Sequence, residues 1–216
     1  MSGRATRRGL FISIEGGDGA GKSSQIARLE KLLAQKGHDV IVTREPGGTK
    51  GGEKIRALLV RGEAGKWSAL TEALLMYAAR ADHLERVIRP ALQAGKTVVT
   101  DRFADSTMAY QGIAGGLGEE RVRALRDLVV EDNEPDLTLI LDLPTEIGLS
   151  RAGGRAGEET RFESKGSAFQ EEVRQAFLKI ARENADRCVV IDARPDEETV
   201  AHAIAEALEK ALQSKA

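Results

Sequence analysis

The stretch from Leu10 to Gln25, LFISIEGGDGAGKSSQ, decides the fold of this chain. Its first six residues, LFISIE, are apolar or favour β-structure, and they predict a buried strand. The segment from Gly16 to Ser23 matches the pattern GxxxxGKS, and a helix with apolar periodicity follows it. Strand, glycine-rich turn and helix in this order are the context that a phosphate-binding P-loop requires. We therefore expect this unit to bind a nucleoside triphosphate.

Each residue type in the loop has a physical role in holding phosphate. The glycines let backbone N–H groups curl around phosphate oxygens, and the helix N-terminus adds partial positive charge. Lys22 can reach the β- and γ-phosphates, and the Ser23 hydroxyl can bind Mg²⁺. An ordinary glycine-rich turn between a strand and a helix would not explain why Lys22 and Ser23 follow the glycines. The dinucleotide-binding pattern GxGxxG does not fit either, because its last glycine would fall on Lys22. The predicted triphosphate-binding residues are Gly16, Gly17, Asp18, Gly19, Ala20, Gly21, Lys22, Ser23 and Ser24.

Length and composition favour one α/β domain with no nucleic-acid or membrane partner. The 216 residues carry 32 basic and 34 acidic side chains, a net charge of −2, so no global field attracts anionic polymers or membranes. No apolar run approaches the roughly 18 residues of a membrane span. The lone Cys188 allows no disulfide within the chain and fits a reducing compartment, so we expect a cytoplasmic protein. Residues 1–8 are expected to be a flexible tail and residues 9–216 a single domain.

Alternation of strands and helices along the chain predicts a parallel sheet with right-handed crossovers. In the predicted helix 71–94, apolar residues at helical spacing are expected to face the core, and Met76, Arg80 and His83 lie on another face. The apolar set is Leu74, Ala78, Ala81, Leu84, Ile88 and Ala91. The strands after 10–15 are expected at 39–43, 96–101, 137–143 and 188–192, the second of the five being buried. The other helices are expected at 53–60, 119–130, 145–150, 167–184 and 199–212, with a short, partly helical segment at 104–111.

Arginines near the predicted strand ends favour a small phosphotransferase over other P-loop proteins. A switch GTPase needs an NKxD motif, but Asn133 is followed by Glu-Pro-Asp, and motor or transporter ATPases are normally larger. The arginines exceed what one triphosphate needs, and guanidinium groups suit phosphate geometry. Separate phosphate sites for a donor and an acceptor would use them all. They are Arg44, Arg56, Arg80, Arg102, Arg151, Arg155 and Arg161.

Several motifs together resemble those of thymidylate kinases: IEGGDGAGKSSQ, TREPGGT, LLMYAARADH, DRFADSTMAYQG and an arginine-glycine segment ending in TRFE. The resemblance runs from the first to the fifth predicted strand. It implies an α/β P-loop kinase fold of three layers, with a five-stranded parallel sheet flanked by helices. It also implies a homodimer that uses ATP and Mg²⁺ to convert dTMP to dTDP for dTTP synthesis. The alternatives are a kinase of another nucleotide or nucleoside and, outside enzymes, a P-loop module that senses nucleotides.

The resemblance also implies roles for individual residues. The P-loop residues would bind ATP with Lys22 acting in catalysis, and Ser23 and Asp101 would hold the metal or its waters. Arg102 would lie between the two phosphates and act in catalysis. Arg56 would bind the dTMP phosphate, and Arg80 would donate hydrogen bonds to the thymine edge. The implied dTMP-binding residues are Asp18, Pro46, Arg56, Met76, Arg80, Arg102, Ser106, Tyr110 and Gln111.

The P-loop departs from that of some relatives at Gly19, where they carry a basic residue. The missing cation is then expected from a lid at about residues 151–163, whose closure would exclude water. Arg151 and Arg155 are the candidates for a catalytic role, with Arg161 as a third.

The predicted acceptor site differs from that of many relatives at Met76, four residues before Arg80. Many relatives have a phenylalanine there that stacks on thymine. A thioether can also pack against the face of an aromatic ring, so contact with the base is still expected.

Overall fold

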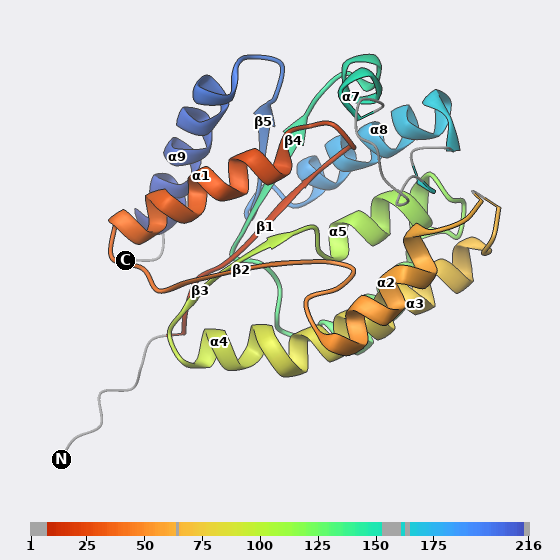
Figure 1. The fold of residues 1–216 in the computed structure, drawn as a ribbon, viewed down its shortest axis with the longest axis horizontal. Helices are drawn as coiled ribbons and strands as arrows, with labels where there is room; N and C mark the ends of the chain where they lie inside the picture. Colours follow the sequence, from red (N-terminus) through yellow and green to blue (C-terminus); the bar gives the residue numbers. More distant parts are fainter. Residues whose placement is uncertain (1–7, 64, 153–160, 163–164, 214–216) are drawn as a thin grey trace.

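The computed structural model describes residues 8–63, 65–152, 161–162 and 165–213, which form one five-stranded sheet covered by helices (Figure 1). The strands run in the order β2-β3-β1-β4-β5, and all neighbours are parallel. The predicted sheet is therefore confirmed, and each strand boundary lies within one residue of its predicted position. The strands are β1 (Phe11–Gly16), β2 (Val40–Arg44), β3 (Thr97–Asp101), β4 (Leu137–Asp142) and β5 (Cys188–Asp192).

Strand β2 differs from the prediction in its burial. It lies at the edge of the sheet and pairs only with β3 within the described chain, and its Val42 side chain is 40% exposed. The sequence VIVT predicts a buried strand because its side chains are apolar or β-branched. An edge position leaves such a strand partly open to solvent.

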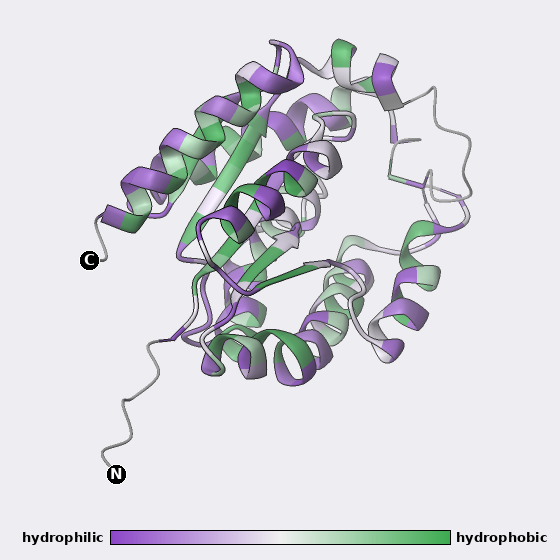
Figure 2. Cartoon of the chain, turned by 60° about the vertical axis from the view of Figure 1, so that its left-hand side comes forward, coloured by the Kyte–Doolittle hydropathy of each residue, from purple (hydrophilic) through white to green (hydrophobic). Residues whose placement is uncertain are grey.

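The helices form layers on both faces of the sheet, which confirms the three-layer α/β/α arrangement (Figure 1). Helices α1 (Lys22–Gln35) and α9 (Glu197–Gln213) enclose one hydrophobic core, and Ile12 and Ile14 of β1 belong to it. Phe11 belongs to the core on the other face, together with residues of α8 (Ser167–Glu183). This alternation follows from the two-residue period of a strand. Hydrophobic residues dominate the central strands, whereas the outer helices carry both kinds of residue (Figure 2).

The predicted helix 71–94 is a continuous helical run with a π-helical turn inside it. Its parts are α3 (Ala69–His83), the π-helical turn η1 (Leu84–Ile88) and α4 (Arg89–Gln93). At the turn, the N–H of Arg89 donates to the carbonyl of Leu84, five residues earlier. Pro90, which lacks an N–H, follows directly and is tolerated in the first turn of α4.

The core-facing side of α3 differs from the side that apolar spacing predicts. Leu74 is 49% exposed, whereas Tyr77 and Arg80 are each only 2% exposed. The charge of Arg80 can be buried because Glu45 pairs with it from another part of the chain, and spacing within one helix carries no sign of that partner. The prediction is therefore wrong for Leu74, Ala78 and Ala81, which are exposed, and confirmed for Leu84, Ile88 and Ala91, which are buried.

The remaining helices lie close to their predicted positions. Helix α2 begins three residues earlier than the predicted residue 53, because the hydroxyl oxygen of Thr49 accepts a hydrogen bond from the N–H of Gly52 (2.8 Å) and caps the helix. No helix in the described ranges is both long and apolar enough to cross a membrane. The other elements are α2 (Lys50–Val60), α5 (Ala104–Thr107), the π-helical turn η2 (Met108–Ile113), α6 (Glu119–Val129) and α7 (Thr145–Ala152).

Candidate active site

The P-loop connects β1 to α1 and is shaped by glycines in the left-handed region. Gly19 has φ of 77° and Gly21 has φ of 87°, conformations that residues with a side chain rarely adopt. Lys22 begins α1, and its ammonium group donates hydrogen bonds to the carbonyls of Gly16 (3.2 Å) and Gly17 (2.9 Å). Burial lowers the pKa of Lys22 to about 8, with Arg102 adding to the effect. A triphosphate would bring the negative charge that this buried cation lacks.

The tip of the loop packs against the backbone of α7. A Cβ atom on Gly19 would lie 2.1 Å from the carbonyl oxygen of Gly148, and one on Gly148 would lie 2.6 Å from the carbonyl oxygen of Asp18. Neither position has room for a side chain unless the backbone moves. The loop therefore cannot hold a basic residue at Gly19 in this arrangement.

The ends of β1, β2 and β3 meet beside the loop. Ser23 and Asp101 line the same open pocket next to it. Oxygen Oδ1 of Asp101 is buried and accepts no hydrogen bond from the described residues. The described residues contain no group of three or more His, Cys, Asp or Glu side chains that could hold a metal. A hydroxyl and one carboxylate fit Mg²⁺, which keeps several waters and takes its other ligands from phosphate.

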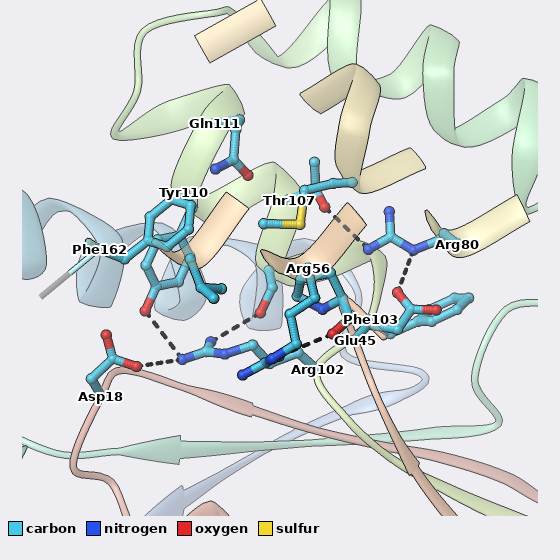
Figure 3. A pocket seen from close by; sticks show the side chains of 14 residues that line it. Asp18, Glu45, Arg56, Arg80, Arg102, Phe103, Thr107, Tyr110, Gln111 and Phe162 are labelled. Atoms are coloured by element: carbon cyan, nitrogen blue, oxygen red, sulfur yellow. Dashed lines mark hydrogen bonds and ion pairs between the residues drawn. The ribbon is translucent and has the colours of Figure 1, made fainter. Parts of the chain in front are cut away.

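Arg102 follows β3 and connects the P-loop to the adjacent pocket (Figure 3). Its Nη1 donates to the carbonyl of Gly16 (2.9 Å) and to the hydroxyl of Ser106 (3.1 Å), and its Nη2 donates to Asp18 (2.8 Å) and Tyr110 (3.3 Å). Its backbone has φ of 68°, a conformation that costs about 1 kcal/mol for a residue with a side chain. Burial alone would lower the pKa of Arg102, but nearby acidic groups outweigh it and hold that pKa above its ordinary value. The guanidinium is thus fixed and permanently charged.

The pocket beyond Arg102 collects every residue predicted to bind dTMP (Figure 3). Asp18 comes from the P-loop, Pro46 from the loop after β2, and the others from α2, α3, α5, η2 and the segment after β3. Sequence reasoning missed Phe103 and Phe162 although both lie inside the quoted motifs, and it assigned no ligand-binding role to Glu45. The full lining is Asp18, Glu45, Pro46, Arg56, Val60, Met76, Arg80, Arg102, Phe103, Ser106, Thr107, Tyr110, Gln111 and Phe162.

Arg80 is held rigidly at one side of the pocket. Its Nε donates to Glu45 (2.7 Å), its Nη2 donates to Thr107 (3.1 Å), and the rings of Tyr77 and Phe103 lie 4.6 and 5.1 Å from its guanidinium carbon. Burial alone would lower the pKa of Arg80, but Glu45 raises it to a net value above the ordinary one. Its Nη1 is buried without a partner among the described residues. One donor of this arginine is therefore left for a ligand.

The wall of the pocket combines a cation with apolar groups. Arg56 donates to the carbonyl of Pro46 (2.9 Å), which holds this arginine beside the TREPGGT turn. Tyr110 and Phe162 pack edge to face, with ring centroids 5.8 Å apart. Met76 lines the same pocket, so the structure offers both a thioether and aromatic rings to a planar ligand.

Glu15 in β1 is a buried acidic residue beneath the pocket that sequence reasoning treated only as part of a strand. Its carboxyl group accepts hydrogen bonds from the N–H of Phe103 (2.7 Å) and the hydroxyl of Ser106 (2.5 Å). Burial, followed by the charge of Asp105, raises the pKa of Glu15 to about 7. Glu15 thereby orients the serine that contacts Arg102.

The three arginines of the predicted lid fall in different places. Arg151 is exposed at the end of α7, and Arg155 lies outside the described residues. Arg161 is 1% exposed, donates to the carbonyls of Leu59 and Glu63 (both 3.0 Å) and pairs with Glu72. It is therefore not an exposed lid cation in this structure.

A P-loop with a buried lysine, joined by a fixed arginine to a second polar and aromatic pocket, defines a P-loop phosphotransferase with separate donor and acceptor sites. Comparison with known proteins gives the family. The family model described as thymidylate kinase matches residues 14–204. A thymidylate kinase from Caulobacter vibrioides is 57% identical over 205 residues, covering 95% of this chain and 98% of the relative. One from Jannaschia sp. is 53% identical, covering 90% and 93%.

A solved structure agrees with these sequence matches. The crystal structure of a thymidylate kinase from Ehrlichia chaffeensis superposes with a TM-score of 0.74 at 34% identity, covering 93% of this chain and 99% of that one. The chain belongs to the thymidylate kinase family and is a nucleoside monophosphate kinase.

Proposed function

We propose that this chain transfers the γ-phosphate of ATP to dTMP, giving dTDP for dTTP synthesis. The observation that carries the proposal is the position of Arg102. It contacts the P-loop at Gly16 and Asp18, and it contacts the acceptor pocket at Ser106 and Tyr110. A guanidinium at this point can neutralise the charge of both phosphates where they meet.

Two unpartnered buried atoms support thymine as the base. Nη1 of Arg80 is a donor and Oε1 of Gln111 is an acceptor, and neither has a partner among the described residues. The Watson–Crick edge of thymine presents a carbonyl oxygen and a ring N–H, which complement this pair. Cytosine presents an amino group and a bare ring nitrogen, so both contacts would be mismatched.

On the donor side, the residues from Gly16 to Ser24 would bind ATP. Ser23 and Asp101 would hold Mg²⁺, and the unpartnered Oδ1 of Asp101 supports this assignment. Bound Mg²⁺ would neutralise charge on the β- and γ-phosphate oxygens. Lys22 would exchange its two backbone carbonyl partners for phosphate oxygens.

The transfer itself needs no general base. The second pKa of a phosphate monoester is about 6, so dTMP arrives largely as a dianion and its oxygen is already a nucleophile. The task of the protein is to bring two anions together without water. Arg56 would bind the dTMP phosphate, and Arg102 would lie between the phosphates. Arg151 and Arg155 would supply the catalytic charge from a lid at about residues 151–163.

A homodimer is the oligomeric state that we propose. Leu70 and Leu74 of α3 and Leu58 of α2 are 45%, 49% and 45% exposed, which is unusual for leucines on neighbouring helices. A second copy that packed on these helices would bury them. Leu74→Glu should then convert the dimer to a monomer in analytical ultracentrifugation. An unchanged sedimentation coefficient would exclude this face.

Two further assignments follow from the sequence. We infer one kinase domain over residues 9–216, since the five predicted strands belong to one sheet. Residues 1–7 of the expected tail lie outside the described residues, and Arg8 pairs with Asp136 (3.0 Å). A cytoplasmic location is supported by Cys188, the single cysteine of the chain, which is buried and unpaired.

A panel of acceptors tests the proposal. ADP release should be fastest with dTMP among dTMP, dUMP, UMP, CMP and AMP, because only thymine and uracil match the donor and acceptor in the pocket. A strong preference for CMP or AMP would refute dTMP as the substrate. ATP binding without acceptor-dependent turnover would instead support the nucleotide-sensing alternative.

A further inference from the structure

A buried polar chain lies behind the base-binding side of the pocket. Nε2 of Gln111 donates to Oε2 of Glu72 (2.8 Å), and the other oxygen of Glu72 accepts from Nη2 of Arg161. These three side chains are each 1% exposed. Lys165 approaches the same carboxylate at 3.3 Å. Glu72 and Arg161 are not in contact with the proposed reacting groups, and the proposed function leaves them without a role.

The carboxylate decides which end of the Gln111 amide enters the pocket. A side-chain amide has a donor end and an acceptor end of nearly the same shape, so its neighbours fix its orientation. An ionised carboxylate only accepts hydrogen bonds, and two cations pair with Glu72. The NH₂ group of Gln111 must therefore face Glu72. The remaining atom, Oε1, is the buried acceptor that has no partner among the described residues.

We propose that Glu72, held by Arg161, is a positioning residue that sets base specificity by fixing the amide of Gln111 with its oxygen toward the acceptor base. This inference rests on the proposed function and deepens it. Without the carboxylate, the amide can rotate and present its NH₂ group. The donor of Arg80 would then have a second donor beside it, and the match to the carbonyl and N–H of thymine would be lost.

The location of Arg161 fits this role. It joins the end of α2, through the carbonyls of Leu59 and Glu63, to Glu72 in α3. Its guanidinium carbon also lies 5.1 Å from the ring of Phe162, which lines the pocket. Arg161 therefore places the carboxylate and a wall of the pocket at the same time.

The test compares discrimination between dTMP and dCMP, measured as the ratio of their kcat/KM values in an ADP-release assay. Glu72→Gln removes the negative charge but leaves Arg161 buried without its partner, so this variant can be too unstable to fold. The double variant Glu72→Leu with Arg161→Met removes both charges and keeps apolar volume. Glu134→Gln is the control, because it removes a carboxylate partner of Arg126 outside the pocket. Thermal melting confirms that each variant is folded.

The folded double variant should lose about five- to tenfold in discrimination, the effect of one hydrogen bond to a neutral group, while Glu134→Gln keeps the wild-type ratio. In a Gln111→Ala background, the same double substitution should change the ratio by less than about twofold, because Glu72 acts through Gln111. A wild-type ratio in the double variant, or an equal loss in both backgrounds, would overturn the inference. If the wild-type protein itself shows no preference for dTMP, the proposed function fails instead.

Discussion

The buried carboxyl group of Glu15 makes the stability of the fold depend on pH near neutrality. Its pKa is about 7 in the folded protein, against an ordinary value of 4.5, and the first cause is burial. The folded state thus binds this proton more tightly than the unfolded chain does. The stabilising contribution is complete below about pH 4.5 and is lost as the pH rises through about 7.

The size of the effect follows from the shift. A difference of about 2.5 pKa units corresponds to about 3 kcal/mol over the whole range, of which about 2 kcal/mol falls between pH 5 and pH 8. Glu15→Gln removes the titration and keeps a carbonyl oxygen for the N–H of Phe103. The stability of the variant relative to the wild type should therefore rise by about 2 kcal/mol from pH 5 to pH 8. For a chain of this length, that is about 4–8 °C in Tm.

Urea unfolding and thermal melting of both proteins from pH 5 to pH 8 measure this difference, and groups common to both cancel. Glu209→Gln, at an ion-paired side chain that is 55% exposed, is the control and should show a nearly constant difference. A constant difference for Glu15→Gln would show that Glu15 is ionised at pH 5 and that burial does not hold its proton. A difference of the opposite sign would show that its hydrogen-bond donors dominate.

Three further predictions concern the donor side. Gly19→Ala should weaken ATP binding by about tenfold or more, because the positive φ and the contact with Gly148 disfavour a side chain there. Gly65→Ala is the control, because a side chain at Gly65 would stand in open space and should leave ATP binding unchanged. Titration with a fluorescent ATP analogue measures the affinity of both variants, and an equal affinity of the two would refute the steric argument. ATP affinity should fall as the pH rises above about 8, because Lys22 loses its proton there in the free protein. Calorimetry at such a pH should detect proton uptake when ATP binds. An ATP affinity that does not change with pH would contradict the lowered pKa of Lys22. Arg155→Ala should lower kcat at least about tenfold with little change in ATP affinity, and unchanged turnover would move the catalytic role to Arg151.

The sheet and the acceptor pocket could be predicted because their signals are local in sequence. The P-loop is one continuous stretch, and every predicted acceptor residue except Arg56 lies in one of the short motifs that resemble those of thymidylate kinases. The same local reasoning assigned the wrong face to α3. Arg80 is buried because Glu45, 35 residues away, neutralises it, and Glu72 is matched by Arg161 from 89 residues away. Contacts over such separations depend on the folded chain, and the apolar period of one helix does not contain them.

The distribution of the arginines has a consequence for catalysis. The sequence suggested that all of them neutralise phosphate, but the structure divides them. Arg44 pairs with Glu53, and Arg80 and Arg161 pair with buried carboxylates.

Among the described residues, Lys22 of the P-loop and Arg56 and Arg102 of the acceptor pocket are three cations near the junction of the two sites, and Asp18 contacts Arg102. A dianionic acceptor and a triphosphate bring more negative charge than these three groups carry. We therefore expect productive binding to depend on Mg²⁺ and on cations from elsewhere in the chain, since a P-loop that excludes a side chain at Gly19 cannot provide one from that position. If the catalytic cation comes from the predicted lid at about residues 151–163, phosphoryl transfer would occur only when the lid encloses both substrates. Such enclosure would limit the hydrolysis of ATP by water.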